Sequence, residues 1–151
     1  MSYFKYLGEK LFIEGVSVQN IVKTNKTPFY LYSEQQIKKN YLNFAKIFKK
    51  INPLICFATK ANTNLTIMRI LGKLGSGADV VSGGELLKAL KAGIKPNKIV
   101  FSGVGKTEEE LKLAIKKKIL LINVESESEA MLVNKIGKKI KKIIPIGFRL
   151  N

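Results

Sequence analysis

Short apolar runs alternate with amphipathic helical patterns over most of this 151-residue chain, and this alternation limits the possible folds more than any other feature. The predicted strands are apolar almost throughout and cover 54–58, 78–81, 98–101, 119–124 and 143–148. Apolar residues at helical spacing follow each of the first four strands, over 65–74, 84–92, 107–117 and 126–137. The alternation indicates an α/β protein whose parallel sheet is covered on both faces.

Two α/β architectures fit this pattern. An open doubly wound sheet accommodates five strands in about 150 residues. The same strands also suit the first five βα units of an eightfold barrel, which normally needs about 250 residues. The sequence stops at 148–151, on the tip of a predicted strand with no helix to cover it. Because an uncovered edge strand invites unwanted pairing, we expect a truncated chain and hence the barrel.

The N-terminal part carries weaker signals. Residues 1–27 show no clear periodicity, whereas 29–32 follow Pro28 and read as a short strand. Ser33 is the expected N-cap of the next helix, with Gln36 at the spacing of a capping box. Apolar residues at helical spacing extend this predicted helix over 34–50.

The net charge of +16 arises from 27 Lys and Arg against 11 Asp and Glu, and it raises the question of nucleic-acid binding. Only Arg69 and Arg149 are arginines, although the planar guanidinium is the usual reader of bases and phosphates. The lysines are spread over every predicted helix, which is typical of solvated faces, so we expect no nucleic-acid partner. No apolar run approaches the roughly 20 residues of a membrane span, and no signal peptide is recognisable. We therefore expect a cytoplasmic protein with no membrane partner.

Few residue types are available for catalysis, because the chain has no His and a single Cys. Cys56 alternates with Leu54 and Ala58 on one strand, which is typical of a small buried apolar residue. A nucleophilic cysteine needs a basic partner such as His, so no catalytic role is expected for Cys56. The absence of His and of a cysteine cluster also predicts no metal site.

Residues 103–107 (GVGKT) superficially resemble a phosphate-binding P-loop. That motif requires a Gly where this chain has Val100, inside a predicted strand. The segment is better explained as a strand-to-helix turn, with Thr107 as N-cap and Glu110 as its capping-box partner.

Lys60 lies at the carboxyl end of the first predicted strand, which is where α/β barrels place their active sites. Period-two alternation puts it on the same face as Cys56 and Ala58, two small residues that leave room for a ligand. A lysine held there cannot easily reach bulk solvent, and desolvation would increase the neutral fraction that attacks an aldehyde. Lys60 is therefore a candidate Schiff-base lysine, although many strand ends carry an ordinary surface lysine.

Two carboxylates follow in a glycine-rich stretch, 75–85. Asp79 lies inside an apolar strand, where a charge is costly unless a cation pairs with it. Glu85 begins a helix, where the helix dipole favours its charge. A site near both residues is one interpretation, and an ordinary helix-start residue is an equally good one for Glu85.

Several long motifs in the same order resemble one family of enzymes. Residues 27–32 (TPFYLY) and 57–62 (FATKAN) resemble the opening segment and the lysine motif of fold-type III pyridoxal phosphate (PLP) decarboxylases. Residues 77–85 (GADVVSGGE), 101–107 (FSGVGKT) and 123–127 (NVESE) are similar to those of diaminopimelate decarboxylases in particular. The resemblance runs from about residue 27 to the end of the chain.

This resemblance implies a partial (β/α)8 TIM barrel of about five βα units over 33–151, of the alanine racemase-like PLP-binding kind. It implies that residues 1–32 contribute to a β-domain built from both chain ends. Lys60 would hold PLP through an imine, Asp79 and Glu85 would lie near it, and Arg149 would face the cofactor ring. The implied reaction converts meso-2,6-diaminopimelate to L-lysine and CO2 in a homodimer with shared active sites.

The chain also departs from the family. The family stacks a His on the PLP ring, and no His is present. Its phosphate grip, the Glu at the pyridine nitrogen and the catalytic Cys and Tyr would lie beyond residue 151, and Cys56 does not match that Cys. We therefore expect the 151 residues alone to be inactive.

Four alternatives stay open. A non-enzymatic PLP homeostasis protein uses the same barrel, but it lacks a strand such as 28–32. Another decarboxylase of this fold would act on ornithine, arginine or carboxynorspermidine, although Gly83 and Gly84 after Ser82 favour diaminopimelate. The other two are a basic nucleic-acid-binding module and a degraded gene product without activity.

Overall fold

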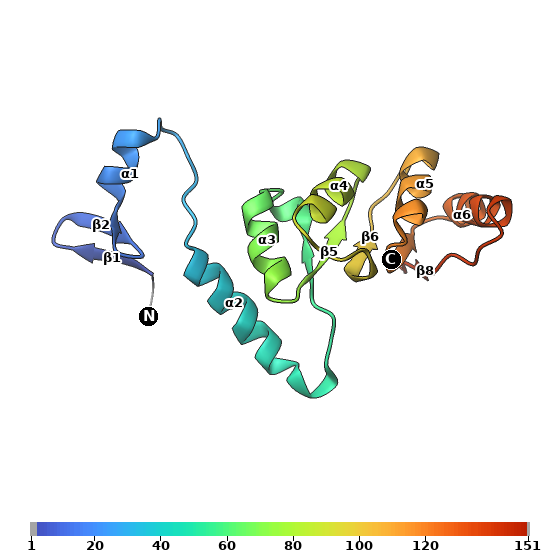
Figure 1. Cartoon of the computed structure of the whole chain (residues 1–151), viewed down its shortest axis with the longest axis horizontal. Coiled ribbons are helices and arrows are strands. Elements are labelled where there is room, and N and C mark those ends of the chain that lie inside the picture. Colours follow the sequence, from blue (N-terminus) through green and yellow to red (C-terminus); the bar gives the residue numbers. More distant parts are fainter. Residues whose placement is uncertain (1–2, 151) are drawn as a thin grey trace. The chain divides into compact units, whose positions relative to one another are not determined.

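The computed structural model of the chain describes residues 3–150 (Figure 1). Backbone contacts divide the chain into two compact units, Met1–Ile51 and Asn52–Asn151. The division expected from the sequence, 1–32 and 33–151, stays a prediction.

The N-terminal unit opens with a small antiparallel sheet that the sequence did not reveal. It contains β1 (Phe4–Leu7), β2 (Lys10–Ile13) and β3 (Val16–Ser17), followed by the short helix α1 (Val18–Thr24). Gly8 and Gly15 stand in the two connecting turns with φ of +59° and +83°, a backbone conformation that favours glycine. The positions of the strands in this sheet are therefore set by the glycine turns rather than by an apolar pattern.

Helix α2 (Glu34–Ile47) begins where the capping signal predicted, since Ser33 Oγ accepts the Gln36 N–H at 2.9 Å. It ends earlier than position 50, and a 3-10 turn, Lys49–Ile51, follows it. The Glu14 carboxylate accepts hydrogen bonds from Ser33 Oγ at 2.6 Å and from the Gln35 N–H at 2.9 Å. These bonds lower the pKa of Glu14 below its ordinary value, the Ser33 bond most of all, and they tie the sheet to the start of α2.

The expected strand over 29–32 is wrong: these residues belong to no strand. Tyr30 is 90% exposed, and no strand in residues 3–150 pairs with the segment. Aromatic residues favour strands only where a neighbouring strand and a covered face receive them.

The C-terminal unit contains a five-stranded parallel sheet, as the alternation predicted. Its strands are β4 (Cys56–Ala58), β5 (Gly77–Val80), β6 (Ile99–Phe101), β7 (Leu121–Val124) and β8 (Ile146–Phe148). Its helices are α3 (Leu65–Lys73), α4 (Gly83–Lys91), α5 (Glu108–Lys117) and α6 (Glu127–Lys139). All of these strands except β5 begin later than predicted, for example β8, where Ile143 is 99% exposed and Pro145 has no N–H to donate.

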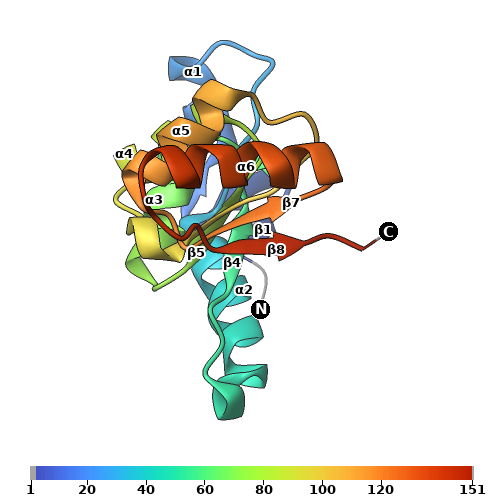
Figure 2. The same cartoon turned by 90° about the vertical axis from the view of Figure 1, so that its right-hand side faces the viewer.

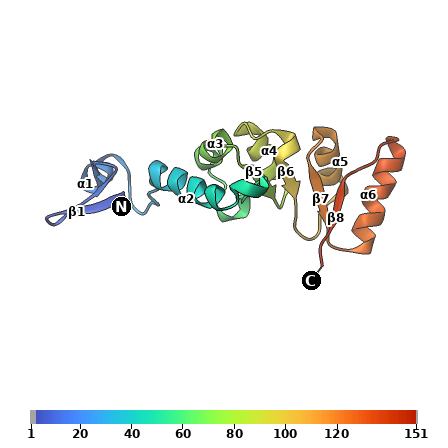
Figure 3. The same ribbon diagram turned by 90° about the horizontal axis from the view of Figure 1, so that it is seen from below.

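The strand order distinguishes the two candidate architectures. The strands follow one another as β4-β5-β6-β7-β8, without the reversal that defines a doubly wound sheet. Successive right-handed crossovers then place every helix on the same face, and α3 to α6 follow the strands on one side (Figures 2 and 3). The unit is a partial (β/α)8 barrel, and the expectation of a sheet covered on both faces is wrong for these residues.

The two faces of the sheet differ in chemistry. The helix-covered face carries the core, with side chains that are at most 1% exposed at Val80, Phe101, Ile122 and Val124. The other face carries the polar residues Asp79, Ser102 and Asn123 together with Gly147, Val100 and Leu121. None of the helices in residues 3–150 has the length and apolarity of a membrane span.

Candidate active site at the carboxyl ends of the strands

Lys60 lies in a 3-10 turn, Thr59–Ala61, that begins directly after β4. The strand ends at Ala58, so the period-two alternation expected to carry Lys60 onto the face of Cys56 does not reach it. The side chain is exposed and forms no hydrogen bond or ion pair within residues 3–150, contrary to the expectation of an enclosed lysine. The amine is therefore available to react.

Thr59 joins the Lys60 turn to the next βα unit, and the sequence analysis did not identify it. The side chain is fully buried, and its Oγ1 lies 3.0 Å from the backbone oxygen of Asp79 and hydrogen-bonds to the Glu85 carboxylate. Glu85 also accepts the Val81 N–H at 2.9 Å. Lys60, Asp79 and Glu85 are thus brought to one place through a single threonine.

The Asp79 carboxylate is held by a hydroxyl rather than by the expected cation. Its Oδ1 accepts a hydrogen bond from Ser102 Oγ at 2.6 Å, and Ser102 Oγ accepts one from Asn123 Nδ2 at 3.1 Å. Asp79 forms no ion pair within residues 3–150. The hydrogen bond reduces the cost of placing this half-buried carboxylate in a strand.

Arg149 lies directly after β8, which is the edge strand on the opposite side of the sheet from β4 and Lys60. Its Nη1 is 3.6 Å from Glu125 Oε1, and its side chain is 56% exposed whereas that of Glu125 is only 8% exposed. The same Glu125 oxygen accepts the Gly103 N–H at 2.8 Å. The structure therefore groups Lys60 with Asp79 and Glu85, and it anchors Arg149 separately through Glu125.

Lys106 is buried, although no sequence pattern predicted its burial. Its Nζ donates to the backbone oxygens of Gly103 at 2.7 Å and Asn123 at 2.6 Å, and to Glu129 Oε1 at 2.9 Å. The ammonium has three N–H donors, and these acceptors use all of them. Lys106 thus has no donor left for a phosphate, which supports the interpretation of 103–107 as a turn.

The glutamate at the third position of helices α4, α5 and α6 recurs as a link between neighbouring loops. Glu85 binds Thr59 in the preceding loop, Glu110 accepts the Gly83 N–H at 2.7 Å, and Glu129 binds Lys106. We call Glu85, Glu110 and Glu129 the loop-to-loop glutamates. The backbone donor at Gly83, and then that at Thr107, lower the pKa of Glu110 below its ordinary value, so this link is made by a carboxylate at neutral pH.

Cys56 is partly buried beside the close approach of Gly77 to the backbone of Lys98. Burial raises the pKa of the Cys56 thiol above its ordinary value, so the thiol stays protonated and a poor nucleophile at neutral pH. Residues 3–150 contain no cluster of three or more side chains suited to a metal ion.

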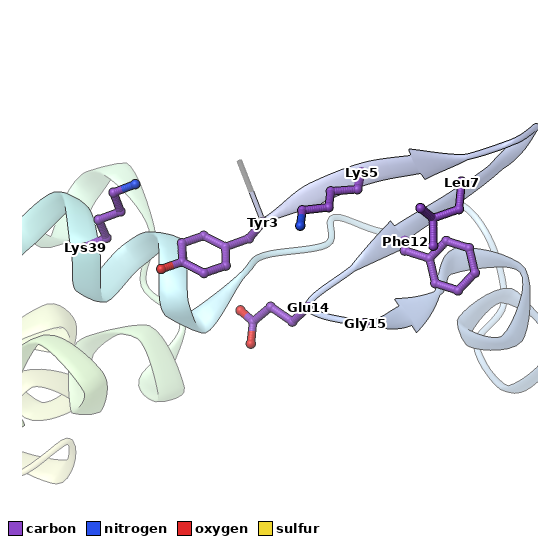
Figure 4. A pocket seen from close by; sticks show the side chains of 7 residues that line it. All are labelled: Tyr3, Lys5, Leu7, Phe12, Glu14, Gly15 and Lys39. Atoms are coloured by element: carbon purple, nitrogen blue, oxygen red, sulfur yellow. The ribbon is translucent and has the colours of Figure 1, made fainter. Parts of the chain in front are cut away.

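A hollow of about 580 Å³ lies in the N-terminal unit, whereas the side chains described above belong to the C-terminal unit (Figure 4). Its wall combines apolar, basic and acidic side chains, from Tyr3, Lys5, Leu7, Phe12, Glu14 and Lys39 together with Gly15. None of the predicted site residues lines it, so the chemistry does not point there.

Comparison with known proteins decides the family. Residues 34–150 match the family model of the pyridoxal-dependent decarboxylases, specifically their pyridoxal binding domain. The chain belongs to this family. This chain is 48% identical over 149 residues to the diaminopimelate decarboxylase of Aquifex aeolicus. The match covers 99% of this chain and 35% of that protein. The chain is 50% identical over 133 residues to that of Helicobacter pylori, covering 88% of this chain and 33% of that protein.

Solved structures agree with the barrel assignment. AQ1208 from Aquifex aeolicus superposes with a TM-score of 0.94 at 48% identity, covering 99% of this chain and 37% of that chain. The Helicobacter pylori diaminopimelate decarboxylase complexed with L-lysine superposes with a TM-score of 0.85 at 48% identity, covering 88% of this chain and 34% of that chain. The chain spans about a third of the length of these relatives. The family resemblance, the partial barrel and the PLP cofactor expected from the sequence are confirmed.

The side chains present suit one part of the cofactor. Lys60 offers an unpaired primary amine for the aldehyde, and Asp79 offers a half-buried carboxylate for a cationic nitrogen. The candidate phosphate donors are already engaged: the Gly83 and Gly103 amides bind Glu110 and Glu125, and Lys106 has no free donor. The described residues therefore fit the aldehyde end of PLP and supply no built grip for its phosphate.

Proposed function

We propose that this chain supplies the cofactor-attaching part of a diaminopimelate decarboxylase, a carboxy-lyase that converts meso-2,6-diaminopimelate to L-lysine and CO2 in lysine biosynthesis. The observation that carries the proposal is the exposed, unpaired Lys60 amine after β4, joined through Thr59 to Asp79 and Glu85. The 48–50% identity to diaminopimelate decarboxylases supports the substrate. Relatives solved in complex with L-lysine support the product.

The residues divide the work as follows. Lys60 would hold PLP covalently through Nζ, while Thr59 and Glu85 keep its turn against β5 and α4. Asp79 would place negative charge beside a cationic nitrogen, and Arg149, held by Glu125, would face the cofactor ring. When bound, PLP supplies the electron sink for the carbanion that loss of CO2 leaves behind. We assign cofactor binding to Lys60, Asp79, Glu85 and Arg149.

Phosphate and substrate binding belong, in this proposal, to the two thirds of the relatives' length that the chain does not match. Residues 1–32 would contribute to a β-domain built from both chain ends, and the intact protein would be a cytoplasmic homodimer with neither a nucleic-acid nor a membrane partner. We expect the 151 residues alone to form no lysine from diaminopimelate. Lysine production by the pure chain would contradict this division of roles.

The alternatives within this fold are less well supported. The arginine decarboxylase of a Chlorella virus is only 21% identical, with a TM-score of 0.69, so it shares the fold and carries no argument about substrate. The absence of a strand at 28–32 removes the sequence argument against a PLP homeostasis protein. The identity to diaminopimelate decarboxylases over nearly the whole chain replaces that argument.

Covalent capture of PLP tests the proposal directly. The chain is incubated with PLP and reduced with borohydride, and the pyridoxyl mass is located by peptide mapping. We expect the label to concentrate on Lys60, and Lys60→Ala to remove at least about nine tenths of it. Lys91→Ala, which removes an exposed lysine of α4, is the matched control and should leave the labelling of Lys60 unchanged. Even labelling of the surface lysines, unaltered in Lys60→Ala, would refute the proposal.

A further inference from the structure

A row of polar groups crosses the helix-free face of the sheet. Asp79 is on β5, Ser102 follows β6, Asn123 is on β7, and Gly147 on β8 stands opposite Asn123. Hydrogen bonds join the first three, from Asn123 Nδ2 to Ser102 Oγ at 3.1 Å and from Ser102 Oγ to Asp79 Oδ1 at 2.6 Å. We call Asp79, Ser102 and Asn123 the polar row.

The amide nitrogen of Asn123 fixes the direction of the polar row. An amide nitrogen can only donate, so Ser102 Oγ must accept from it. The single Ser102 proton is then free for Asp79, whose Oδ1 acts as the acceptor. Asn123 therefore acts on Asp79 through Ser102, by fixing the hydroxyl so that its proton points at Asp79 Oδ1.

Gly147 leaves the space that Asn123 occupies. A Cβ at position 147 would lie 2.6 Å from Asn123 Oδ1, much closer than real Cβ contacts. A side chain there would displace the amide and break the row at its donor end. The backbone of β8 therefore takes part in holding Asp79, although two strands, β6 and β7, lie between β8 and β5.

The other oxygen of Asp79, Oδ2, has no hydrogen-bond partner within residues 3–150. The row thus fixes one oxygen and leaves the other for a positive group. Thr59 Oγ1 lies 3.0 Å from the backbone oxygen of Asp79, so the turn that carries Lys60 lies beside the same residue. A cationic nitrogen near Lys60 is the kind of group that this free oxygen suits.

We propose that Ser102 and Asn123 are positioning residues for PLP attachment: they orient Asp79 as a charged acceptor whose free oxygen faces a cationic nitrogen of the cofactor or the amino-acid substrate. This inference rests on the proposed function, because it requires the cofactor at Lys60. A purely structural row would stabilise the sheet without affecting capture of PLP. The two roles can be separated by measuring stability and PLP capture in the same variants.

The first experiment tests the direction of the row by thermal unfolding of the full chain without PLP. Asn123→Asp makes two carboxylates compete for one Ser102 proton, and we expect Tm to fall by roughly 4–8 °C. The double variant Asp79→Asn/Asn123→Asp reverses the row, since the new amide at 79 donates to Ser102 and Ser102 donates to the new carboxylate at 123. Its Tm should recover at least about half of the loss; an equal or larger loss would overturn the assigned direction.

The second experiment tests the coupling to the cofactor, read as the PLP concentration that half-labels Lys60 under borohydride reduction. Ser102→Ala should raise this concentration roughly tenfold when Asp79 is present and by less than about twofold in the Asp79→Asn background. Ser128→Ala, at an exposed serine of α6, is the matched control and should change nothing. Equal effects of Ser102→Ala in both backgrounds would overturn the positioning role. If Lys60 is not labelled at all, the proposed function fails, whereas the Tm results still decide whether the row exists.

Discussion

Replacing Lys106 with Met is expected to lower the free energy of unfolding by about 3–5 kcal/mol, because it leaves a buried carboxylate without its cation. The Lys106 side chain is 1% exposed and that of Glu129 is 9% exposed. Met fills a similar volume, so little of the loss would come from a cavity. The backbone oxygens of Gly103 and Asn123 would also lose their donor. Urea denaturation followed by circular dichroism measures the change.

Lys112→Met provides the matched control. Lys112 pairs with Glu108 at 2.6 Å, a distance similar to that of the buried pair, but both side chains are about half exposed. Exposed pairs contribute little to stability, so this variant should unfold close to the parent. Adding Glu129→Gln to Lys106→Met removes the stranded charge and should recover part of the loss. Equal urea midpoints for Lys106→Met and Lys112→Met would contradict the role assigned to Lys106.

Gly77→Ala is expected to cost about 3 kcal/mol, near the upper end of the usual range for overpacking. A Cβ at position 77 would lie 2.3 Å from the backbone oxygen of Lys98 and 2.7 Å from Cys56 Sγ. A backbone atom cannot move aside as the end of a side chain can, so β5 would have to shift. Because Asp79 is two residues further along β5, we also expect weaker labelling of Lys60 by PLP.

Gly84→Ala separates crowding from the mere loss of a glycine. Its Cβ would meet nothing closer than Ser82 Oγ at 3.8 Å, and position 84 lies in the first turn of α4. Ala favours helix more than Gly does, so this variant should be as stable as the parent or slightly more so. Equal unfolding temperatures for the Gly77→Ala and Gly84→Ala proteins would show that β5 tolerates the added methyl group.

The repeating unit of the barrel was predictable because its signals are local. Apolar runs located all five parallel strands, and side-chain caps located the starts of helices. The Ser33 cap and the capping box of Thr107 and Glu110 both appear in the structure. Such signals depend on residues three or four positions apart, which a single sequence displays directly.

The part of the N-terminal unit before α2 was poorly predicted, because its structure depends on turns and on strand partners. Strands of two to four residues carry too little pattern to be recognised, and Glu14 adopts a φ of +48° that no simple rule assigns to glutamate. The aromatic run at 29–32 looked like a strand but lacks a neighbour to pair with. Aromatic residues favour a strand only where a neighbouring strand packs against them, and a single sequence does not show whether such a neighbour exists.

The residues proposed for the site stood out in the sequence, whereas the residues that hold them in place did not. Lys60 and Asp79 stand out because charge ends or interrupts an apolar strand. Thr59, Ser102 and Lys106 do not, because their burial follows from contacts 17 to 26 residues apart. Asp79 was expected to need a cation, yet a neutral hydroxyl that itself receives an amide proton stabilises it. The Ser102 hydroxyl and the Asn123 amide come close to Asp79 only when the sheet has folded.

The loop-to-loop glutamates give the barrel a preferred direction of assembly. Thr59 meets Glu85 26 residues later, Gly83 meets Glu110 27 residues later, and Lys106 meets Glu129 23 residues later. Because synthesis runs from the N-terminus, the earlier member of each pair is made first. Its hydrogen bond to the glutamate can form only after the following unit has been synthesised. Of the three pairs, the one that holds the turn of Lys60 is completed first along the chain, at Glu85, before those completed at Glu110 and Glu129.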